Sequence, residues 1–245
     1  MNIDDYYLVQ SERSLVSPEL AATFGNTAEE ITKKVRRLLF HPCECPKNFD
    51  VTNWPRPYAV KDIEAGLNHH QPFCGNCRVF SMLSVAIMRE KGIPARSRCG
   101  FATYFIPGFF EDHWIIEYKN ADGKWQKADA QKSLYDVKNG EFICGAAAWK
   151  MVRNLCFDAN LFGFSRFSEY GLYYVAANMI RDMCGLLKNE IGYNEIIADV
   201  MDENHLYSEK ELAALDALSD VILAEDINRL DEIYKDIVKT GELVL

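Results

Sequence analysis

The sequence lacks several features that would place it at once in a familiar class of protein. No apolar run approaches the ~18 residues that a membrane-spanning helix requires, so we expect no membrane partner. The N-terminal stretch MNIDDYYLVQSERS is acidic and aromatic, and it contains neither the basic nor the apolar region of a secretory signal. Internal repeats and low-complexity tracts are absent as well. Together these absences predict a globular protein of the cytoplasm.

A surplus of positive charge is also missing. The 27 Lys and Arg residues face 36 Asp and Glu residues, which gives a formal net charge of −9 at pH 7. Residues 190–245 carry 15 acidic and 4 basic residues, which leaves residues 1–189 with a net charge near +2. Because nucleic acid phosphates are bound through clusters of Lys and Arg, we expect no nucleic acid partner. We interpret the acidic C-terminal segment as solvated helix faces.

The sequence does contain enough apolar side chain for a core, since 49% of its 245 residues are hydrophobic. It also contains eight cysteines. A reducing cytosol keeps cysteines as thiols, and a chain of this length needs no disulfide to fold. Three of them lie among apolar neighbours and are interpreted as small core residues: Cys144, Cys156 and Cys184.

The first part of the chain predicts helices separated by a long loop. Thr27-Ala-Glu-Glu30 has the form of a capping box and opens a helix whose apolar residues continue to Leu39. Four prolines between residues 42 and 57 predict a loop. A short helix is expected at about Asp62–Asn68.

The middle of the chain predicts one long helix followed by strands. Apolar residues at helical spacing begin at Cys77, and Gly92 with the proline two residues later ends the helix. Residues 95–105 and 113–118 are rich in aromatic and branched side chains, as strands are. The turn signal NADGKW then leads into a third short strand, Trp125–Asp129.

Beyond residue 130 the helical period dominates, and residues 227–237 carry a one-sided apolar stripe that should pack on the core. We therefore predict an α+β fold and a single domain over residues 1–245. Its catalytic core should span about residues 60–145, with the long helix packed on a small antiparallel sheet. A helical extension should follow over about residues 146–245.

Cys77 is the first residue with a chemical role to consider. A cysteine in the first turn of a helix lies close to unpaired N–H groups and the positive end of the helix dipole, which favour its thiolate. Gly75 just before it would let the backbone turn tightly and leave access for a substrate. The alternative is a buried cysteine at the start of a core helix.

The predicted hairpin supplies two possible partners for this thiol. If the turn centres near Ala121, antiparallel pairing places opposite each other residues whose numbers sum to about 242. His113 and Asp129 satisfy this sum and become cross-strand neighbours. An imidazole beside a carboxylate is the base and orienting pair that a nucleophile requires. A slip of one residue would turn one of the two to the opposite face.

Three stretches together resemble a known family: GNCRVFSMLSVAIMREKGIPARSRCG, DHWIIEY and GKWQKADAQ. They contain a small residue two before a cysteine, a helix that ends in Gly-Ile-Pro-Ala-Arg, a histidine strand, and a Gly-x-Trp hairpin leading to an aspartate. Over residues 75–131 the sequence resembles the transglutaminase-like superfamily of papain-like thiol enzymes, in the manner of a bacterial-type single-domain member. The resemblance implies that Cys77 is the nucleophile, His113 the base and Asp129 the orienting acid.

The resemblance also implies the reaction. The Cys77 thiolate would attack an amide carbonyl, His113 would protonate the leaving amine, and water or another amine would take the acyl group from the thioester. The expected partner is therefore a protein, peptide or small amide substrate, and no cofactor or metal is implied. Hydrolysis, as in a protease or amidase, and acyl transfer, as in a transglutaminase, both remain open.

Several neighbouring residues are candidates for supporting roles. The backbone N–H of Cys77 is the first donor expected for the oxyanion. Gln71 and Gln131 are candidates for a second donor or for support of the site, although a surface role is the simpler interpretation of Gln71. Trp114 and Trp125 flank the hairpin and are candidates for lining a substrate channel, with ordinary cross-strand packing as the alternative.

Arg96 and Arg98 follow the long helix. They are interpreted either as solvated strand charges or as a buried arginine that pairs with an acid such as Glu117.

Other functions stay open at this point. A zinc site could use two cysteine pairs, although it would consume the Cys77 thiol and leave the histidine–aspartate pair unexplained. A redox pair of Cys74 and Cys77 is disfavoured because no strand precedes it, although their oxidation could mask the nucleophile. A binding module without activity could use the same fold. The cysteines of the zinc alternative are Cys43, Cys45, Cys74 and Cys77.

Overall fold

The computed structural model describes residues 2–45, 57–69, 72–154 and 157–243. The chain divides into two compact units. The first unit consists of residues 1–97 and 114–138, and the second of residues 98–113 and 139–245. The predicted limits, one domain with a core that ends near residue 145, stay a prediction.

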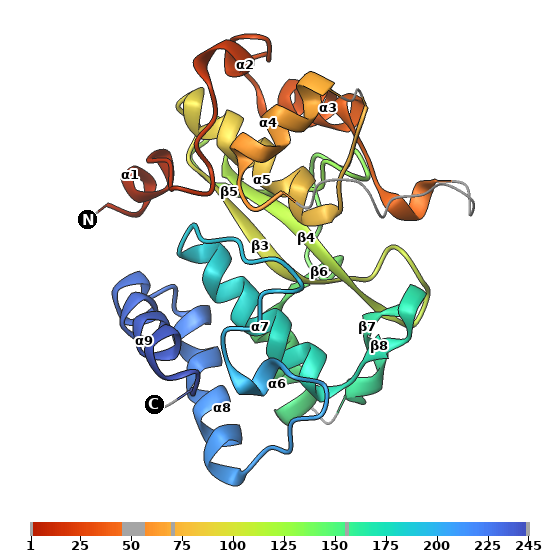
Figure 1. The fold of residues 1–245 in the computed structure, drawn as a ribbon, viewed down its shortest axis with the longest axis vertical. Coiled ribbons are helices and arrows are strands. Elements are labelled where there is room, and N and C mark those ends of the chain that lie inside the picture. Colours follow the sequence, from red (N-terminus) through yellow and green to blue (C-terminus); the bar gives the residue numbers. More distant parts are fainter. Residues whose placement is uncertain (1, 46–56, 70–71, 155–156, 244–245) are drawn as a thin grey trace. The chain divides into compact units, whose positions relative to one another are not determined.

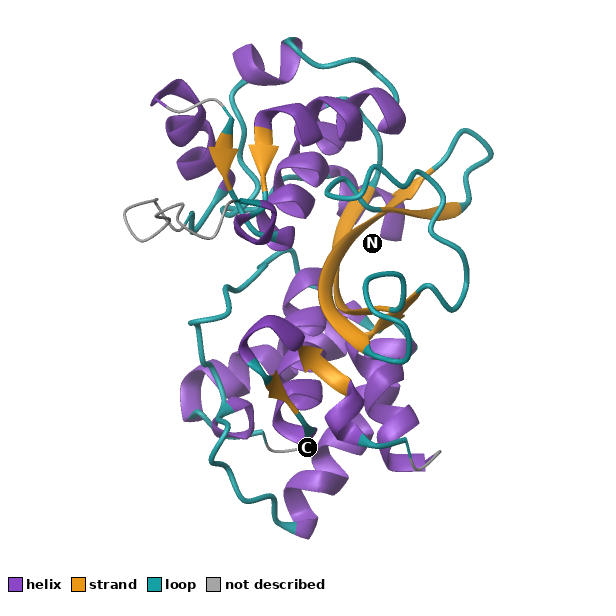
Figure 2. Ribbon diagram, turned by 90° about the vertical axis from the view of Figure 1, so that its right-hand side faces the viewer, coloured by secondary structure: helices purple, strands orange, loops and turns teal. Residues whose placement is uncertain are grey.

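The first unit contains most of the N-terminal helices. Its 3₁₀-helix η1 covers Pro42–Glu44, and its short strands β1 (Leu39–Phe40) and β2 (Phe73–Cys74) form a parallel pair (Figure 2). Among the described residues its α-helices are α1 (Ile3–Leu8), α2 (Pro18–Ala22), α3 (Ala28–Leu38), α4 (Val60–His69) and α5 (Cys77–Glu90). Three helices expected from the sequence are therefore confirmed, with the Thr27 capping box at the start of α3.

Helix α5 is the centre of the first unit. Every residue from Cys77 to Arg89 is buried, so the helix is enclosed on all sides and Figure 1 shows α3 and α4 beside it. Most of these residues are apolar, and the helix belongs inside the core, where its buried polar side chains are hydrogen-bonded. It ends as predicted, since Gly92 has a φ of +75°, which an L side chain rarely adopts.

The same helix lies on the sheet. The Ser81 hydroxyl donates a hydrogen bond to the carbonyl oxygen of Ile115 at 2.8 Å, which ties α5 to strand β4 (Phe110–Lys119). Phe80 and Leu83 belong to the same apolar cluster as Ile116. The predicted packing of the cysteine-bearing helix on a sheet is therefore confirmed.

The hairpin that follows has a different register from the one predicted. Strand β4 pairs antiparallel with β5 (Trp125–Ala128), and the partners run from Lys119↔Trp125 to Ile116↔Ala128. Their residue numbers sum to 244, because the turn centres on residue 122 and not on residue 121. The direct cross-strand pair of His113 with Asp129 is therefore wrong, since continuing this register would put Ile115 opposite Asp129.

The sheet is also not purely antiparallel. Strand β3 (Ala95–Ala102) pairs antiparallel with β6 (Phe142–Cys144), but β4 pairs in parallel with β7 (Phe162–Phe164). The sheet order is β6-β3-β4-β7-β8, with β5 added on β4 and β8 covering Glu169–Tyr170. The predicted small antiparallel sheet is therefore corrected to a mixed one.

The second unit is dominated by helices, as the C-terminal periodicity predicts. Among the described residues these are α6 (Gly145–Asn154), η2 (Ala159–Leu161), η3 (Ser165–Phe167), α7 (Leu172–Leu186), η4 (Asp199–Met201), α8 (Glu209–Leu223) and α9 (Ile227–Thr240). The apolar stripe of α9 packs inward, with Leu230, Ile233 and Ile237 buried. Cys184 is a buried core thiol as predicted, Cys144 is partly buried, and Cys156 lies outside the described residues.

Helix α7 holds the strands of the second unit through buried polar groups. The Arg98 guanidinium donates two hydrogen bonds to the Asp182 carboxylate, at 2.8 and 2.9 Å, and the backbone N–H of Cys99 donates a third to it. The Asn178 amide donates to the carbonyl oxygen of Gly100 and to the Asp112 carboxylate. These contacts fix β3 and the start of β4 to one helix.

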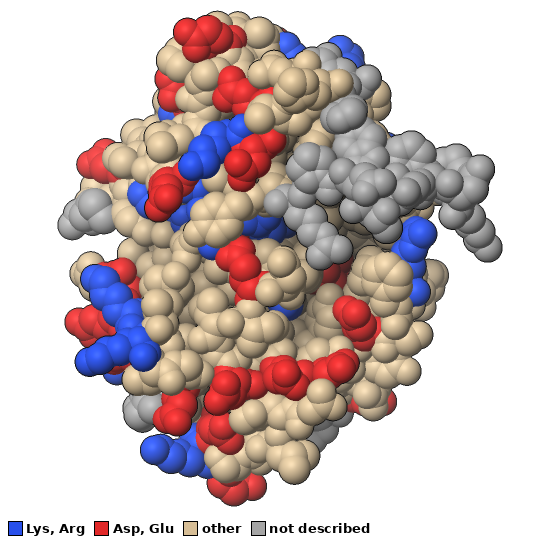
Figure 3. Space-filling model, in the orientation of Figure 1, with Lys and Arg blue, Asp and Glu red and all other residues tan. Residues whose placement is uncertain are grey.

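The acidic C-terminal helices present their charges to solvent. Asp220 on α8 and Glu232 and Asp236 on α9 are exposed, which agrees with the predicted solvated faces. Figure 3 shows many acidic side chains over the helices of the second unit on the face that it draws. Among the described helices, none is both long and apolar enough to cross a membrane.

The difference between a buried and an exposed ion pair gives a stability prediction. Asp182 is fully buried, whereas Asp216 accepts two hydrogen bonds from Arg153 with 40% of its side chain exposed. Asp182→Asn should lower the free energy of unfolding by about 3 kcal/mol, because it leaves the Arg98 charge buried beside a neutral amide.

The matched control is Asp216→Asn, for which we expect a loss of no more than about 1 kcal/mol because water screens the pair. Urea unfolding followed by circular dichroism measures both losses. Equal losses for the two variants would contradict the assignment of a structural role to the buried pair.

Candidate active site

Cys77 is the first residue of α5, and its surroundings explain why the helix begins there. Asn76 is the N-cap, and its side-chain oxygen accepts a hydrogen bond from the backbone N–H of Val79 at 3.3 Å. A Cβ atom on Gly75 would lie 2.6 Å from a methyl carbon of Val79, so the glycine is required by close packing. Cys77 is 4% exposed. The predicted position of a thiol at the start of a buried helix is confirmed.

Cys74 lies in a different electrostatic environment. Burial, together with the neighbouring Cys45 thiol, raises the pKa of Cys74 to about 11. Its thiol is therefore protonated at neutral pH and is a poor nucleophile. No disulfide joins Cys74 and Cys77 in the structure, and the idea that they oxidise together stays a prediction.

The cysteines of the zinc alternative and the nearby His41 are not arranged as a metal site. His41 accepts a hydrogen bond from the backbone N–H of Cys43 through Nδ1, at 3.1 Å, and serves as the N-cap of η1. Within the described part of the chain, no group of three or more His, Cys, Asp or Glu side chains could hold a metal ion. All four cysteines of that alternative belong to the described part.

His113 lies on β4 and is 2% exposed. Two aromatic rings of the loop between β3 and β4 cover it edge-on. The ring centroid of Phe105 is 4.9 Å from that of the imidazole, and the ring centroid of Tyr104 is 6.1 Å from it. Glu111, two residues before His113, is buried as well. Sequence reasoning missed these three neighbours, although alternation along a longer strand would have found Glu111.

Asp129 follows the last residue of β5 and is 1% exposed. Its backbone pairs with that of Leu134 in both directions, at 2.8 and 3.0 Å. One oxygen of its carboxylate accepts a hydrogen bond from the backbone N–H of Lys132 at 3.1 Å. A tight turn with Ser133 in the left-handed region therefore fixes this carboxylate.

Trp125 packs within the first unit. Its ring lies 4.3 Å from the Arg96 guanidinium carbon and 5.6 Å, edge-on, from the Tyr7 ring. Arg96 is buried and donates to Glu117 at 2.8 Å, which confirms the predicted buried pair, whereas Arg98 pairs with Asp182. The contacts of Trp125 are those of a packing residue, and its role in a substrate channel stays a prediction.

Two further candidates carry buried polar atoms with no hydrogen-bond partner in the described part of the chain. These atoms are the Trp114 Nε1 and the Gln131 Oε1. A buried polar group without a partner costs about 1–3 kcal/mol, so a native protein normally has a reason to keep one. Neither atom has a hydrogen-bond partner among the described residues. Gln71 lies outside these residues.

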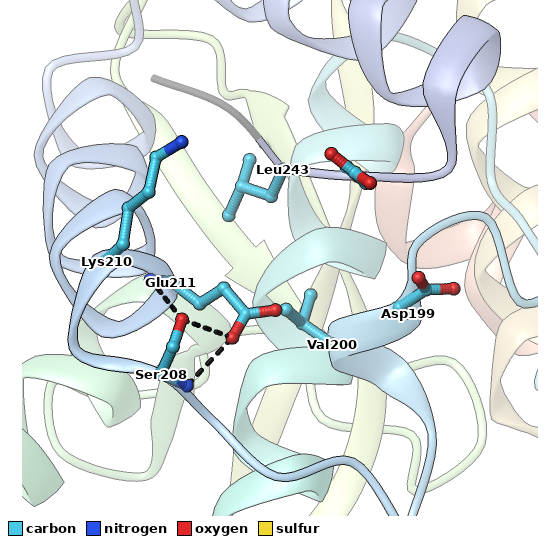
Figure 4. Close-up of a pocket in the computed structure, with 7 residues that line it drawn as sticks. Asp199, Val200, Ser208, Lys210, Glu211 and Leu243 are labelled. Atoms are coloured by element: carbon cyan, nitrogen blue, oxygen red, sulfur yellow. Dashed lines mark hydrogen bonds between the residues drawn. The ribbon is translucent and has the colours of Figure 1, made fainter.

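One pocket of the second unit holds none of the candidate residues. It encloses about 280 Å³, and Figure 4 shows the side chains around it. Its Glu211 carboxylate is already bound by the backbone N–H and the hydroxyl of Ser208, as part of the cap of α8. The lining residues are Asp199, Val200, Ser208, Lys210, Glu211, Glu242 and Leu243.

The raised pKa of Cys74 predicts how the two neighbouring cysteines differ. At pH 8 a thiol with a pKa of about 11 has roughly a hundredfold less thiolate than an ordinary thiol, so iodoacetamide should label Cys74 slowly. Peptide mapping after timed labelling measures each rate, with the exposed Cys43 as the internal control. Labelling of Cys74 as fast as that of Cys43 would contradict the prediction.

Comparisons with known proteins place the candidate residues within one matched stretch of the chain. A family model described as the transglutaminase-like superfamily matches residues 18–130, which contain Cys77, His113 and Asp129. A search of curated proteins gave no match. Among solved structures the chain is similar to that of a "putative cysteine protease from Cytophaga hutchinsonii", at 20% identity and a TM-score of 0.42. That similarity covers 59% of this chain and 47%, about half, of the other. Residues 18–130, somewhat less than half of the chain, are therefore similar to the transglutaminase-like superfamily.

Proposed function

We propose that this chain is a thiol enzyme that acts on amide bonds, with Cys77 as nucleophile, His113 as base and Asp129 as orienting acid. The observation that carries the proposal is the position of Cys77 in the first turn of a capped, fully buried helix. The N–H groups and the dipole at that end of the helix favour a thiolate. The match of residues 18–130 to the transglutaminase-like family model supports the same role.

The proposed reaction begins with transfer of the Cys77 proton to His113. The thiolate attacks the amide carbonyl, which forms a carbon–sulfur bond and an oxyanion. Collapse of this intermediate breaks the carbon–nitrogen bond while the imidazolium gives its proton to the leaving amine, and a thioester remains. Water or an amine then attacks the thioester, His113 takes the proton of the attacking group, and the thiolate leaves.

The observed hairpin register supports the role proposed for Asp129. It differs from the predicted register by two residues, an even number, so Asp129 keeps the same face of the hairpin. In this register it comes opposite Ile115, which shares a face of β4 with His113 by strand alternation. The pairing of His113 with Asp129 therefore remains part of the proposal.

The supporting roles belong to the proposal as well. The backbone N–H of Cys77 would donate to the oxyanion, and Gln131, whose amide oxygen is buried without a described partner, would hold the site together. Gln71 and Trp114 stay candidates for a second donor and for the channel wall. The substrate would be a protein, peptide or small amide, acted on without a cofactor, in the cytoplasm.

The rival function is a binding module on the same fold, and the reactivity of Cys77 separates the two. We expect iodoacetamide to alkylate Cys77 at pH 6 at least tenfold faster than any other thiol, because an ion pair with His113 keeps it a thiolate. p-Nitrophenyl acetate should add one acetyl group to Cys77 under acid quench. Timed mass spectrometry measures both reactions.

His113→Gln should abolish both reactions at pH 6, whereas His205→Gln, in the second unit, should leave them unchanged as the matched control. Slow labelling of Cys77 that follows an ordinary thiol pKa of about 8.5, without an acetylated intermediate, would favour the binding module.

A further inference from the structure

Two buried titratable groups share one face of strand β4. Residues two apart in a strand point to the same side, so Glu111 and His113 are neighbours on that side, and Asp112 between them points to the other. Glu111 is 7% exposed and His113 is 2% exposed. A carboxylate and an imidazole therefore lie side by side with little access to water.

The Glu111 carboxylate is held by neutral groups. Glu111 pairs with Gly163 of β7. Both oxygens of its carboxylate are 3.3 Å from the backbone nitrogen of Ser165 in η3. Among the described residues, no Lys or Arg forms an ion pair with it. Burial raises the pKa of Glu111 above its usual value, while His113 acts in the opposite direction.

Asp112, the other acidic neighbour of His113, is already engaged elsewhere. Its carboxylate accepts a hydrogen bond from the Asn178 amide of α7 at 2.7 Å. Arg181 of the same helix and the Tyr193 hydroxyl lower the pKa of Asp112 against a larger effect of burial. His113 acts on Asp112 in the same direction as on Glu111, so both acids are electrostatic neighbours of the imidazole. Asp112 is tied to α7, whereas Glu111 lies on the side of the strand that His113 shares.

The aromatic loop strengthens the effect of a nearby charge. The Phe105 and Tyr104 rings cover the imidazole edge-on at 4.9 and 6.1 Å between centroids. Rings in these positions keep water away from the imidazole, and a charge–charge interaction increases as the local dielectric constant falls. Tyr104 is also the titratable group that faces His113 from this loop, and it is neutral near pH 7.

We infer that Glu111 is a positioning residue that acts through His113, as a second carboxylate that stabilises the imidazolium in addition to Asp129. The inference rests on the proposed function for its role in the reaction, and on the geometry of β4 for the coupling itself. The negative charge of Glu111 favours the protonated imidazole, so it raises the pKa of His113. When Glu111 is protonated at acidic pH, this effect is lost.

The consequence for the reaction concerns the alkaline side of its pH range. His113 must hold a proton to give to the leaving amine, so a higher His113 pKa extends activity to higher pH. Removing the charge of Glu111 should shift the alkaline limb of the activity profile to lower pH. A residue with only a structural role would change the rate without moving this limb.

The test measures the pKa of His113 directly by NMR. It uses the Cys77→Ala protein, so that the thiol does not couple to the imidazole, and assigns the His113 Cε1–H signal by comparison with His113→Gln. We expect Glu111→Gln to lower the His113 pKa by about one pH unit, because the substitution removes a buried negative charge beside the imidazole. The glutamine retains an oxygen for the Ser165 N–H. Glu169→Gln removes an exposed acid of the same unit and should leave the pKa unchanged.

A second measurement needs no change at Glu111. The Cε1–H signal of His113 should show a smaller inflection at the pKa at which the Glu111 carboxyl carbon titrates, because coupled groups report each other. An unchanged His113 pKa in folded Glu111→Gln, or the absence of that inflection, would overturn the inference. The coupling is measured in a chain without Cys77, so failure of the proposed enzyme activity leaves this result independent.

Discussion

The structure of the first unit depends on one constraint, which is that all sides of α5 are buried while the position of its first turn is fixed. The apolar contacts with the β4–β5 hairpin and the hydrogen bond from Ser81 to the Ile115 carbonyl fix the helix along its length. The cap by Asn76 and the close approach of Gly75 to Val79 then fix where the helix begins. These contacts hold the backbone of Cys77 at that point. A nucleophile in this position takes its electrostatic environment from the backbone of the fold.

Local signals predicted the elements that carry the candidate site. The hairpin register and the pairing partners depend on contacts that these signals do not specify. Helix α5, its start at Cys77 and its end at Gly92 follow from spacing and capping, which act within a few residues. The hairpin register was wrong by two residues because the Asn120 side chain accepts the backbone N–H groups of Asp122 and Lys124, which centres the turn on residue 122. Turn centres depend on such side-chain contacts, which a turn signal alone does not locate.

The long-range pairings could not be predicted from the sequence, for a different reason. Arg98 could be predicted as a buried cation, but its partner Asp182 is 84 residues away on a helix of the second unit. Nothing in either local sequence distinguishes that pair from a pair with Glu117, which instead binds Arg96. The parallel pairing of β4 with β7 was missed likewise, because Phe162–Phe164 is too short to be recognised as a strand. The sequence shows which residues are charged, whereas tertiary packing determines which of them pair.

Successive residues of strand β4 face opposite sides and make different contacts. Asp112 points toward α7 and is bound by Asn178, which anchors the strand. Glu111 and His113 point to the other side, where the backbone N–H of Ser165 donates to the Glu111 carboxylate. Both acids interact electrostatically with His113, but Asp112 is also bound by α7, whereas Glu111 shares the side of the imidazole. The pleat of strand β4 thus places one of two neighbouring carboxylates on the side of His113 and the other on the side of α7.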